Sequence, residues 1–230
     1  MRRRSKRPTV PKKSPEEKLV VARDHFKLPK DTLSEGDYAL GFDPGKRNLG
    51  WAVFQIRDKK AQYVGTGTLK VKGASKPQTA NKQIQFDNES ILHLNEFLSD
   101  LMKKYKPKVI CWEDTMGGGI STARTLLGEV QGLIKLTAYM ENDSTVMLAG
   151  QTRCMETLLL GTSLKRGLKK IATGEKIKSL FPKKLEDRKV TKTGQFTHEA
   201  DAIGCLYALF RANDINIEGV SYEKDSTDGD

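Results

Sequence analysis

The sequence predicts an α/β fold, in which a mixed five-stranded sheet is flanked by helices. One observation is a run of three apolar segments at about 38–43, 49–57 and 61–72, separated by short turns. Another is that helices and strands alternate after these three segments. Short turns predict an antiparallel meander, and helical crossovers predict parallel strands.

Each later element of the sheet has a local signal. Apolar residues spaced three and four apart predict a helix at about 81–105, and Pro107 ends it. The apolar run 108–114 predicts a buried strand parallel to the first one, because a helix connects the two. A further helix is expected at 121–141 and a fifth strand at 145–149.

The last third of the chain is expected to be mainly helical. Segments at about 152–160 and 174–181 have a helical pattern, and 161–173 between them is interpreted as a loop or broken helix. A strongly apolar helix is expected at about 197–212. It should be part of the core.

The two ends of the chain differ from the middle. Residues 1–37 are expected to form a basic, flexible N-terminal extension, because the first thirteen residues contain seven Lys or Arg and no acid. Within it, Ser14 and Glu17 have the spacing of a helix capping box. A globular domain is expected at 38–213, followed by an acidic C-terminal tail at 214–230.

Charge and cysteine content limit the class of protein. The 230 residues carry a formal net charge of +11, which favours a polyanionic partner such as nucleic acid. A solvated lysine surface is the alternative, and charge alone does not separate the two. The three cysteines (Cys111, Cys154 and Cys205) are far apart in apolar segments, as expected for reduced core residues of an intracellular protein. We expect no membrane association, because no apolar run has the length of a membrane span.

Three acidic residues and a histidine each end or begin a buried element. Asp43 and Glu113 end strands that are expected to be parallel neighbours, and active sites of such sheets gather at those ends. His198 and Asp201 are three residues apart at the start of the last helix, so they share a face. Each has an ordinary explanation alone, as a turn former, a strand-end acid or a first-turn acid. Their coincidence indicates a site.

Converging carboxylates need cations to remain ionised. Carboxylate oxygens are hard ligands, which select Mg²⁺ or Mn²⁺. Paired metal ions clamp the attacking and leaving oxygens of a phosphodiester. An acidic, metal-binding centre in a basic chain therefore indicates a nuclease.

Several stretches carry a family resemblance, and they occur in one order along the chain. They are Gly41–Gly45 (GFDPG), Asn48–Val53 (NLGWAV), Val109–Glu113 (VICWE), Ser121–Gly132 (STARTLLGEVQG) and His198–Ala202 (HEADA). They resemble the motifs of the RuvC family of Holliday-junction resolvases, which have the RNase H-like (retroviral-integrase-like) fold. The match extends over roughly 38–210, so the resemblance implies an RNase H-like nuclease domain at 38–213. The basic extension is not part of the usual compact bacterial enzyme.

The resemblance implies a set of catalytic residues. Asp43, Glu113 and Asp201 would be metal ligands for two Mg²⁺ ions per active site, with Mn²⁺ as a substitute. His198 would be a further ligand or a proton-handling group beside the metal.

Two neighbouring acids are alternatives to these ligands. Asp114 follows Glu113, and Glu199 precedes Asp201 by two positions. Strand alternation places Glu113 and Asp114 on opposite faces, so only one of them can be in the site.

A basic segment lies just before the last helix and should flank the site. Residues 165–192 contain eleven Lys or Arg against three acids. The expected phosphate contacts are Lys165, Arg166, Lys169 and Lys170, with Arg153, Lys46 and Arg47 as second choices. For any single one of them, a solvated surface lysine or arginine is an equally good explanation.

The sequence therefore predicts a metal-dependent, structure-specific endonuclease of DNA recombination and repair that resolves four-way (Holliday) junctions by paired phosphodiester hydrolysis. A homodimer is expected, with helix 121–141 as the family's usual interface element. Other branched DNA (forks or flaps) and RNA–DNA hybrids are alternative substrates, and a non-catalytic nucleic-acid-binding module is an alternative of another class. We expect an intracellular, DNA-associated protein of a bacterium or a phage-infected cell, with an organelle or a nucleus as the alternative.

Overall fold

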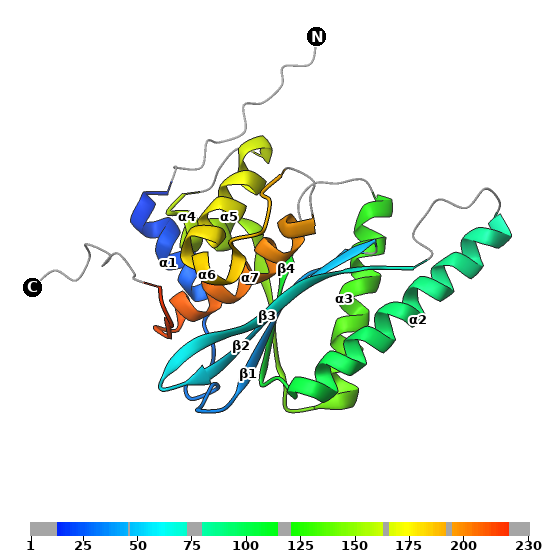
Figure 1. Cartoon of the computed structure of the whole chain (residues 1–230), viewed down its shortest axis with the longest axis horizontal. Coiled ribbons are helices and arrows are strands. Elements are labelled where there is room, and N and C mark those ends of the chain that lie inside the picture. The colour runs from blue at the N-terminus through cyan, green and yellow to red at the C-terminus, as the bar shows by residue number, and fades with distance from the viewer. Residues whose placement is uncertain are drawn as a thin grey trace, which may run out of the picture.

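The computed structural model describes the chain in six ranges. They are residues 13–45, 47–72, 80–114, 121–162, 166–191 and 195–220; the side chains of 80–87, 121–126, 166, 167 and 195 are not described. The predicted α/β class is confirmed, because a mixed sheet lies between two groups of helices (Figure 1).

The sheet of the described residues has six strands, in the order β5-β4-β1-β2-β3-β6. The strands are β1 (Tyr38–Asp43), β2 (Asn48–Arg57), β3 (Lys60–Lys70), β4 (Val109–Asp114), β5 (Val146–Gln151) and β6 (Asn216–Ile217). As predicted, β1, β2 and β3 form an antiparallel meander, and β1, β4 and β5 are parallel.

The predicted number of five strands is wrong by one. The two-residue strand β6 pairs in parallel with the start of β3. Its Ile217 is buried in the core, so the fourth residue of the segment expected to be an acidic tail is packed against the fold. Two residues are too few for a periodic signal, which is why the sequence did not indicate this strand.

The helices form two layers, one on each face of the sheet (Figure 1). They are α1 (Pro15–His25), α2 (Ala80–Tyr105), α3 (Ser121–Glu141), α4 (Thr152–Leu160), α5 (Arg166–Leu180), α6 (Pro182–Leu185) and α7 (Gln195–Ala212). One layer consists of α2 and α3. In the other, α7 packs directly on the strands, and α4 and α5 pack on α7.

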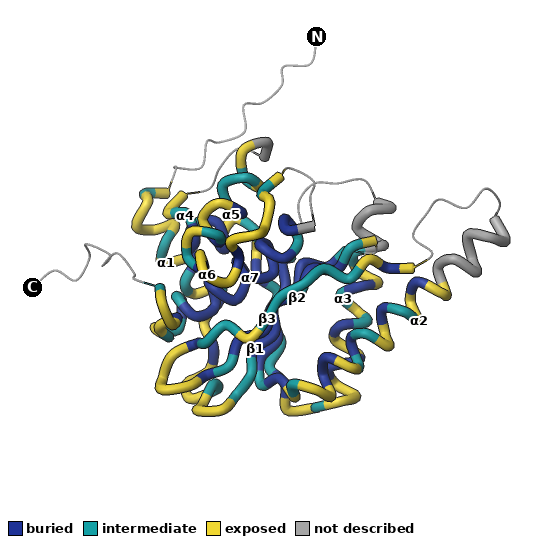
Figure 2. Tube along the Cα trace, in the orientation of Figure 1, coloured by how far each residue is buried: buried dark blue, intermediate teal, exposed yellow. Residues whose placement is uncertain are grey.

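Alternation along the strands divides the core into two parts. In β1, Leu40 and Phe42 face α2 and α3, whereas Ala39 faces α7. In β4, Ile110 and Trp112 face α2 and α3, whereas Cys111 faces α7. The central strands are therefore buried on both sides, as Figure 2 shows.

The N-terminal segment is packed where it was expected to be flexible. Ser14 and Glu17 form the predicted capping box at the start of α1. Ala22 and Phe26 are 1% and 0% exposed, because α1 packs on α4 and Phe26 fills the space above Gly150. The basic residues 1–12 lie outside the described residues, and the division of the chain at residue 37 remains a prediction.

Helix α5 corrects a second expectation. Residues 166–173, interpreted as loop or broken helix, belong to α5, which continues to Leu180. Its lysine-rich sequence has few apolar residues, so the helical period was weak there. The correction matters because this helix carries basic residues to the end of the sheet where β1 and β4 finish.

Candidate metal centre

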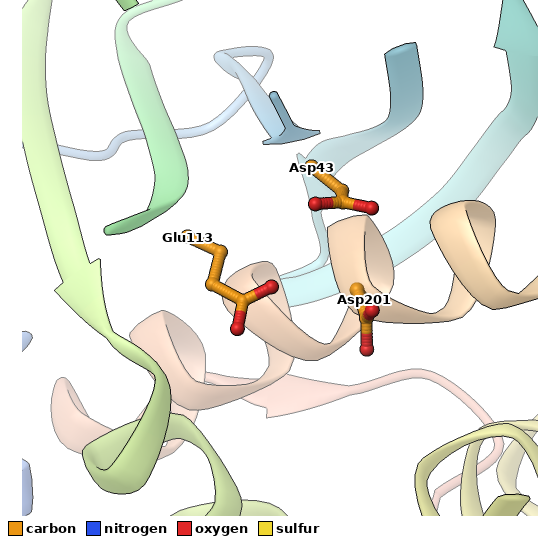
Figure 3. A group of neighbouring side chains, drawn as sticks. All are labelled: Asp43, Glu113 and Asp201. Atoms are coloured by element: carbon orange, nitrogen blue, oxygen red, sulfur yellow. The ribbon is translucent and has the colours of Figure 1, made fainter. Parts of the chain in front are cut away.

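Three carboxylates meet at the end of the sheet. Asp43 is the last residue of β1, Glu113 lies at the end of the parallel strand β4, and Asp201 lies on α7. Each offers an oxygen, and these oxygens lie within 4.8 Å of one another. Figure 3 shows the three side chains gathered together, with Asp43 and Asp201 next to Glu113. We call them the acidic triad.

Strand alternation explains why these acids meet. Asp43 shares the α7-facing side of β1 with Ala39, and Glu113 shares that side of β4 with Cys111. Both strands run in the same direction, so both acids finish at the same end of the sheet.

Two glycines let α7 approach the sheet closely. A Cβ atom on Gly41 would lie 2.4 Å from the carbonyl oxygen of Ala202, and one on Gly50 would lie 2.1 Å from that of His198. No side chain fits at either distance. The backbone of α7 therefore rests directly on β1 and β2, which places Asp201 beside Asp43.

Burial disfavours charge on two members of the triad, Asp43 and Asp201. The three residues are only 8%, 6% and 3% exposed, in chain order. Burial raises the pKa of Asp201 well above its ordinary range, and the charges of Glu113 and Asp43 raise it further. Burial also raises the pKa of Asp43, although its contact with His198 opposes the shift. The nearby lysines do not fully compensate for the burial and repulsion of these carboxylates, so an additional cation would stabilise their charged form.

Asp201 provides the test of whether a metal ion fits. Its Oδ1 atom is buried and accepts no hydrogen bond from the residues that the structure describes. A buried carboxylate oxygen without a partner is costly, and a metal ion is one of the groups that satisfies it. Three converging oxygen donors are also the ligand type of Mg²⁺ and Mn²⁺. The donor set fits such a cation.

His198 lies beside Asp43. Its Nδ1 is 2.5 Å from Oδ2 of Asp43, and its side chain is 24% exposed. The histidine therefore connects the triad to solvent. Its predicted role as a ligand or proton-handling group remains a prediction.

Glu113 has two further contacts that sequence reasoning missed. Its Oε1 accepts a hydrogen bond from the hydroxyl of Thr152, the first residue of α4, at 2.5 Å. It also forms an ion pair with Lys169, which pairs in turn with Glu156. One signal for Glu156 was available, because it is the one acidic residue in helix 152–160 and three leucines follow it at 158–160.

The alternative acids lie outside the triad. Glu199 is buried, and its Oε2 lies 3.3 Å from the guanidinium of Arg188. Asp114 is half-buried and, by alternation, is on the strand face opposite to Glu113. Neither belongs to the metal-holding group found among the described residues.

The predicted phosphate contacts are only partly described. Arg47, Arg153 and Lys170 are exposed, and Lys170 lies close enough to oppose the raised pKa of Asp43 and of Asp201. Lys169 is mostly buried in its ion pairs. The positions of Lys46 and Lys165 and the side chain of Arg166 lie outside the described residues. Assignment of these residues to DNA remains a prediction.

The chain is similar to known proteins both in sequence and in fold. No family model matches the chain. Proteins named crossover junction endodeoxyribonuclease RuvC match it: the one from Rickettsia typhi is 30% identical over 95 residues (41% of this chain and 54% of the relative), and the one from Brucella anthropi is 27% identical over 97 residues (42% and 51%). The chain thus spans about half the length of the curated relatives it matches.

Solved resolvase structures share the fold. Thermus thermophilus RuvC matches with a TM-score of 0.53 at 16% identity, over 77% of this chain and 97% of that protein. The resemblance to the RuvC family is confirmed. The yeast mitochondrial Holliday junction resolvase Ydc2 has the same RuvC-like fold, with a TM-score of 0.56 at 14% identity over 85% of each chain. T. thermophilus RuvC in complex with a Holliday junction substrate also matches, with a TM-score of 0.54 at 14% identity over 77% of this chain and 95% of that one.

The described helices of the chain also differ from membrane-spanning helices. None in the described part of the chain combines the length and the hydropathy that crossing a membrane requires.

Proposed function

We propose that this protein is a metal-dependent endonuclease that resolves four-way DNA junctions by paired phosphodiester hydrolysis. The observation that carries the proposal is the acidic triad, buried at the end of a RuvC-like sheet. The relatives named crossover junction endodeoxyribonuclease support the choice of reaction. The structure solved with a Holliday junction supports the choice of substrate. We place the activity within the cell, on its DNA.

Asp43, Glu113 and Asp201 would hold Mg²⁺ or Mn²⁺, two ions in each site. When bound, such ions polarise a phosphodiester and lower the pKa of water that attacks it. The chain's own residues set up the site. The hydroxyl of Thr152 fixes the carboxylate of Glu113, and His198 contacts Asp43.

The positive charge around the triad would hold the DNA backbone. The formal charge of +11 is concentrated in part in the basic segment 165–192, which includes α5 and α6. Lys170 is exposed near the triad, and Arg153 is exposed next to Thr152, which contacts Glu113. A scissile phosphate would have to lie at this end of the sheet. Such contacts are independent of DNA sequence, so they suit recognition of a branched shape.

The opposite layer of helices offers a surface for a homodimer. On α3, Leu136, Tyr139 and Met140 are 56%, 64% and 76% exposed, and Leu92 on α2 is 61% exposed. An apolar groove lined by residues such as Ile91 and Leu136 separates the two helices. Exposed apolar clusters of this kind mark interfaces. A four-way junction has two-fold symmetry, which a symmetric dimer matches.

The deciding experiment is incubation of the protein with a mobile four-way junction, with and without Mg²⁺. We expect paired, symmetric nicks that depend on the metal and leave 5′-phosphate and 3′-hydroxyl ends. Fork, linear duplex and RNA–DNA hybrid of the same length are the comparison substrates. Equal cutting of all four would reject junction specificity, and preferential cutting of fork or hybrid would reassign the substrate. Binding without any Mg²⁺- or Mn²⁺-dependent nicking would indicate a non-catalytic module.

A further inference from the structure

The ammonium group of Lys169 lies between two carboxylates. Its Nζ is 2.8 Å from Oε1 of Glu156 and 3.4 Å from Oε1 of Glu113. The side chain of Lys169 is 17% exposed, and those of Glu156 and Glu113 are 3% and 7% exposed. Because solvent barely reaches these ion pairs, their charges interact more strongly than a surface pair would.

Glu113 meets two donors at one oxygen. Its Oε1 accepts both the hydroxyl of Thr152 and the ammonium of Lys169. A carboxylate oxygen has two lone pairs, so these donors fill the acceptor positions of Oε1. A metal ion at the acidic triad would repel a neighbouring ammonium but not a neutral hydroxyl. Lys169 is therefore the donor that metal binding would displace.

Glu156 would keep its ion pair with the ammonium group of Lys169 after that group has left Glu113. It is 2% exposed on α4, and it is outside the acidic triad. Oε1 of Glu156 is 2.8 Å from Nζ of Lys169, whereas Oε1 of Glu113 is 3.4 Å from it, a difference of 0.6 Å. When the contact with Glu113 is lost, Lys169 therefore keeps a charged partner.

We propose that Lys169 is the internal counterion of the metal-free site, and that its ammonium and the divalent metal compete for Glu113. Glu156 is the positioning residue that holds Lys169 at the triad. The inference rests on the proposed function in one respect, namely that the triad binds metal. In this role Lys169 neutralises Glu113 in the absence of DNA, in addition to its predicted contact with a DNA phosphate.

The test is metal binding by DNA-free protein in which Lys169 is replaced, Lys169→Met. Titration calorimetry with Mg²⁺ and electron paramagnetic resonance with Mn²⁺ measure the affinity. We expect about tenfold tighter metal binding, because the competing charge is gone. We also expect a lower thermal midpoint of the metal-free protein. Unchanged or weaker metal binding would overturn the proposal.

Lys170→Met is the matched control. Lys170 also acts on the charges of Asp43 and Asp201, but it makes neither of the ion pairs of Lys169 in the described part of the chain. We expect a smaller gain in affinity than for Lys169→Met. Equal increases in metal affinity for the two variants would mean that the loss of any nearby positive charge has the same effect, and the counterion proposal would be wrong. Lys169→Gln replaces the methionine variant if that variant does not fold.

A double-mutant cycle tests Glu156. If Glu156 acts through Lys169, Glu156→Gln changes metal affinity in the wild-type background and has little effect in the Lys169→Met background. Equal effects in both backgrounds would remove Glu156 from the proposal. Wild-type protein that binds no divalent metal would overturn the proposed function itself, whereas wild-type binding with an unchanged Lys169→Met variant would overturn only this inference.

Discussion

Asp43 is the residue on which the proposed site depends most. It ends β1, contacts His198 through Oδ2 and belongs to the acidic triad. We expect Asp43→Asn to abolish cleavage of a four-way junction, because a neutral amide is a poor ligand for Mg²⁺. Binding of the junction should persist, since the basic surface is unchanged.

A nicking assay and a gel-shift assay on the same preparation check this pair of outcomes for Asp43→Asn. The control is Asp114→Asn, which removes an acid from the opposite face of β4. Cleavage by Asp43→Asn at the wild-type rate would show that the metal is held elsewhere.

In the metal-free protein, the charge of Asp201 beside two other buried acids lowers the stability of the fold. In the metal-free protein, Asp201→Asn should raise stability by on the order of 1 kcal/mol, because it removes a buried, repelled charge. In a chain of this size, that corresponds to a rise of about 2–4 °C in the thermal midpoint. Thermal unfolding with and without Mg²⁺ is the measurement. The wild type should be stabilised by Mg²⁺ and the variant should not, and a variant that loses stability without metal would contradict this account.

Among the elements, α7 is held at the distance that the site needs by glycine in β1 and β2. Gly50→Ala would place a Cβ 2.1 Å from a backbone oxygen of His198, so the helix would have to move. We expect a loss of about 1–3 kcal/mol of stability from overpacking. Metal affinity should fall as well, because His198 and Asp201 move with the helix.

The control for this substitution is Gly65→Ala in β3, where an added Cβ meets no atom within 4 Å. Denaturant unfolding gives the stability, and Mn²⁺ titration gives the affinity. A Gly50→Ala variant with normal stability and metal binding would mean that the close approach of α7 is unimportant.

The helix α1 is an integral part of the fold in the structure. Phe26→Ala should cost about 3–5 kcal/mol, because a fully buried ring leaves a cavity between α1, α4 and Gly150. Denaturant unfolding measures the loss. Val20→Ala, at a position 57% exposed on the same helix, is the control and should change stability little. A near-neutral Phe26→Ala variant would support the original expectation of a flexible extension.

The features that the sequence predicts are those set by residues close together in the chain, and the features that it does not predict depend on contacts between distant segments. The strands and most helices follow from local periodicity, and the meeting of Asp43 and Glu113 follows from strand direction and alternation. Asp201 lies on a helix, so its place beside them was expected from its position at the start of that helix and from the family resemblance. The packing of α1 was not predictable, because it depends on a distant partner, α4. The ion pairs of Lys169 were missed for the same reason, since they join three elements that only the tertiary structure brings together.

At the scale of the whole molecule, the two layers of helices differ in the kind of surface that they carry. The layer with α7 builds the acidic triad, and the layer with α2 and α3 carries the exposed apolar surface. If that surface pairs two copies, Met140→Glu should convert a dimer into a monomer. Junction cleavage should then change from paired to single nicks, because each active site would act alone.

Sedimentation velocity and an assay of paired nicking on a supercoiled cruciform check this prediction. Val20→Glu places the same charge on an exposed apolar residue of the opposite layer, and it should leave assembly unchanged. A wild-type protein that is monomeric at the concentrations of the cleavage assay would contradict the dimer.

The contact between α1 and β5 has a consequence for solubility. Because β5 is outermost in the sheet, its free edge could pair with a strand of another molecule and start aggregation. His25 binds that strand at its end, where its Nε2 accepts a hydrogen bond from the backbone N–H of Gln151 at 2.9 Å. A protein shortened to begin at residue 38 would lose this contact. It should therefore self-associate through β5, even with its metal site intact.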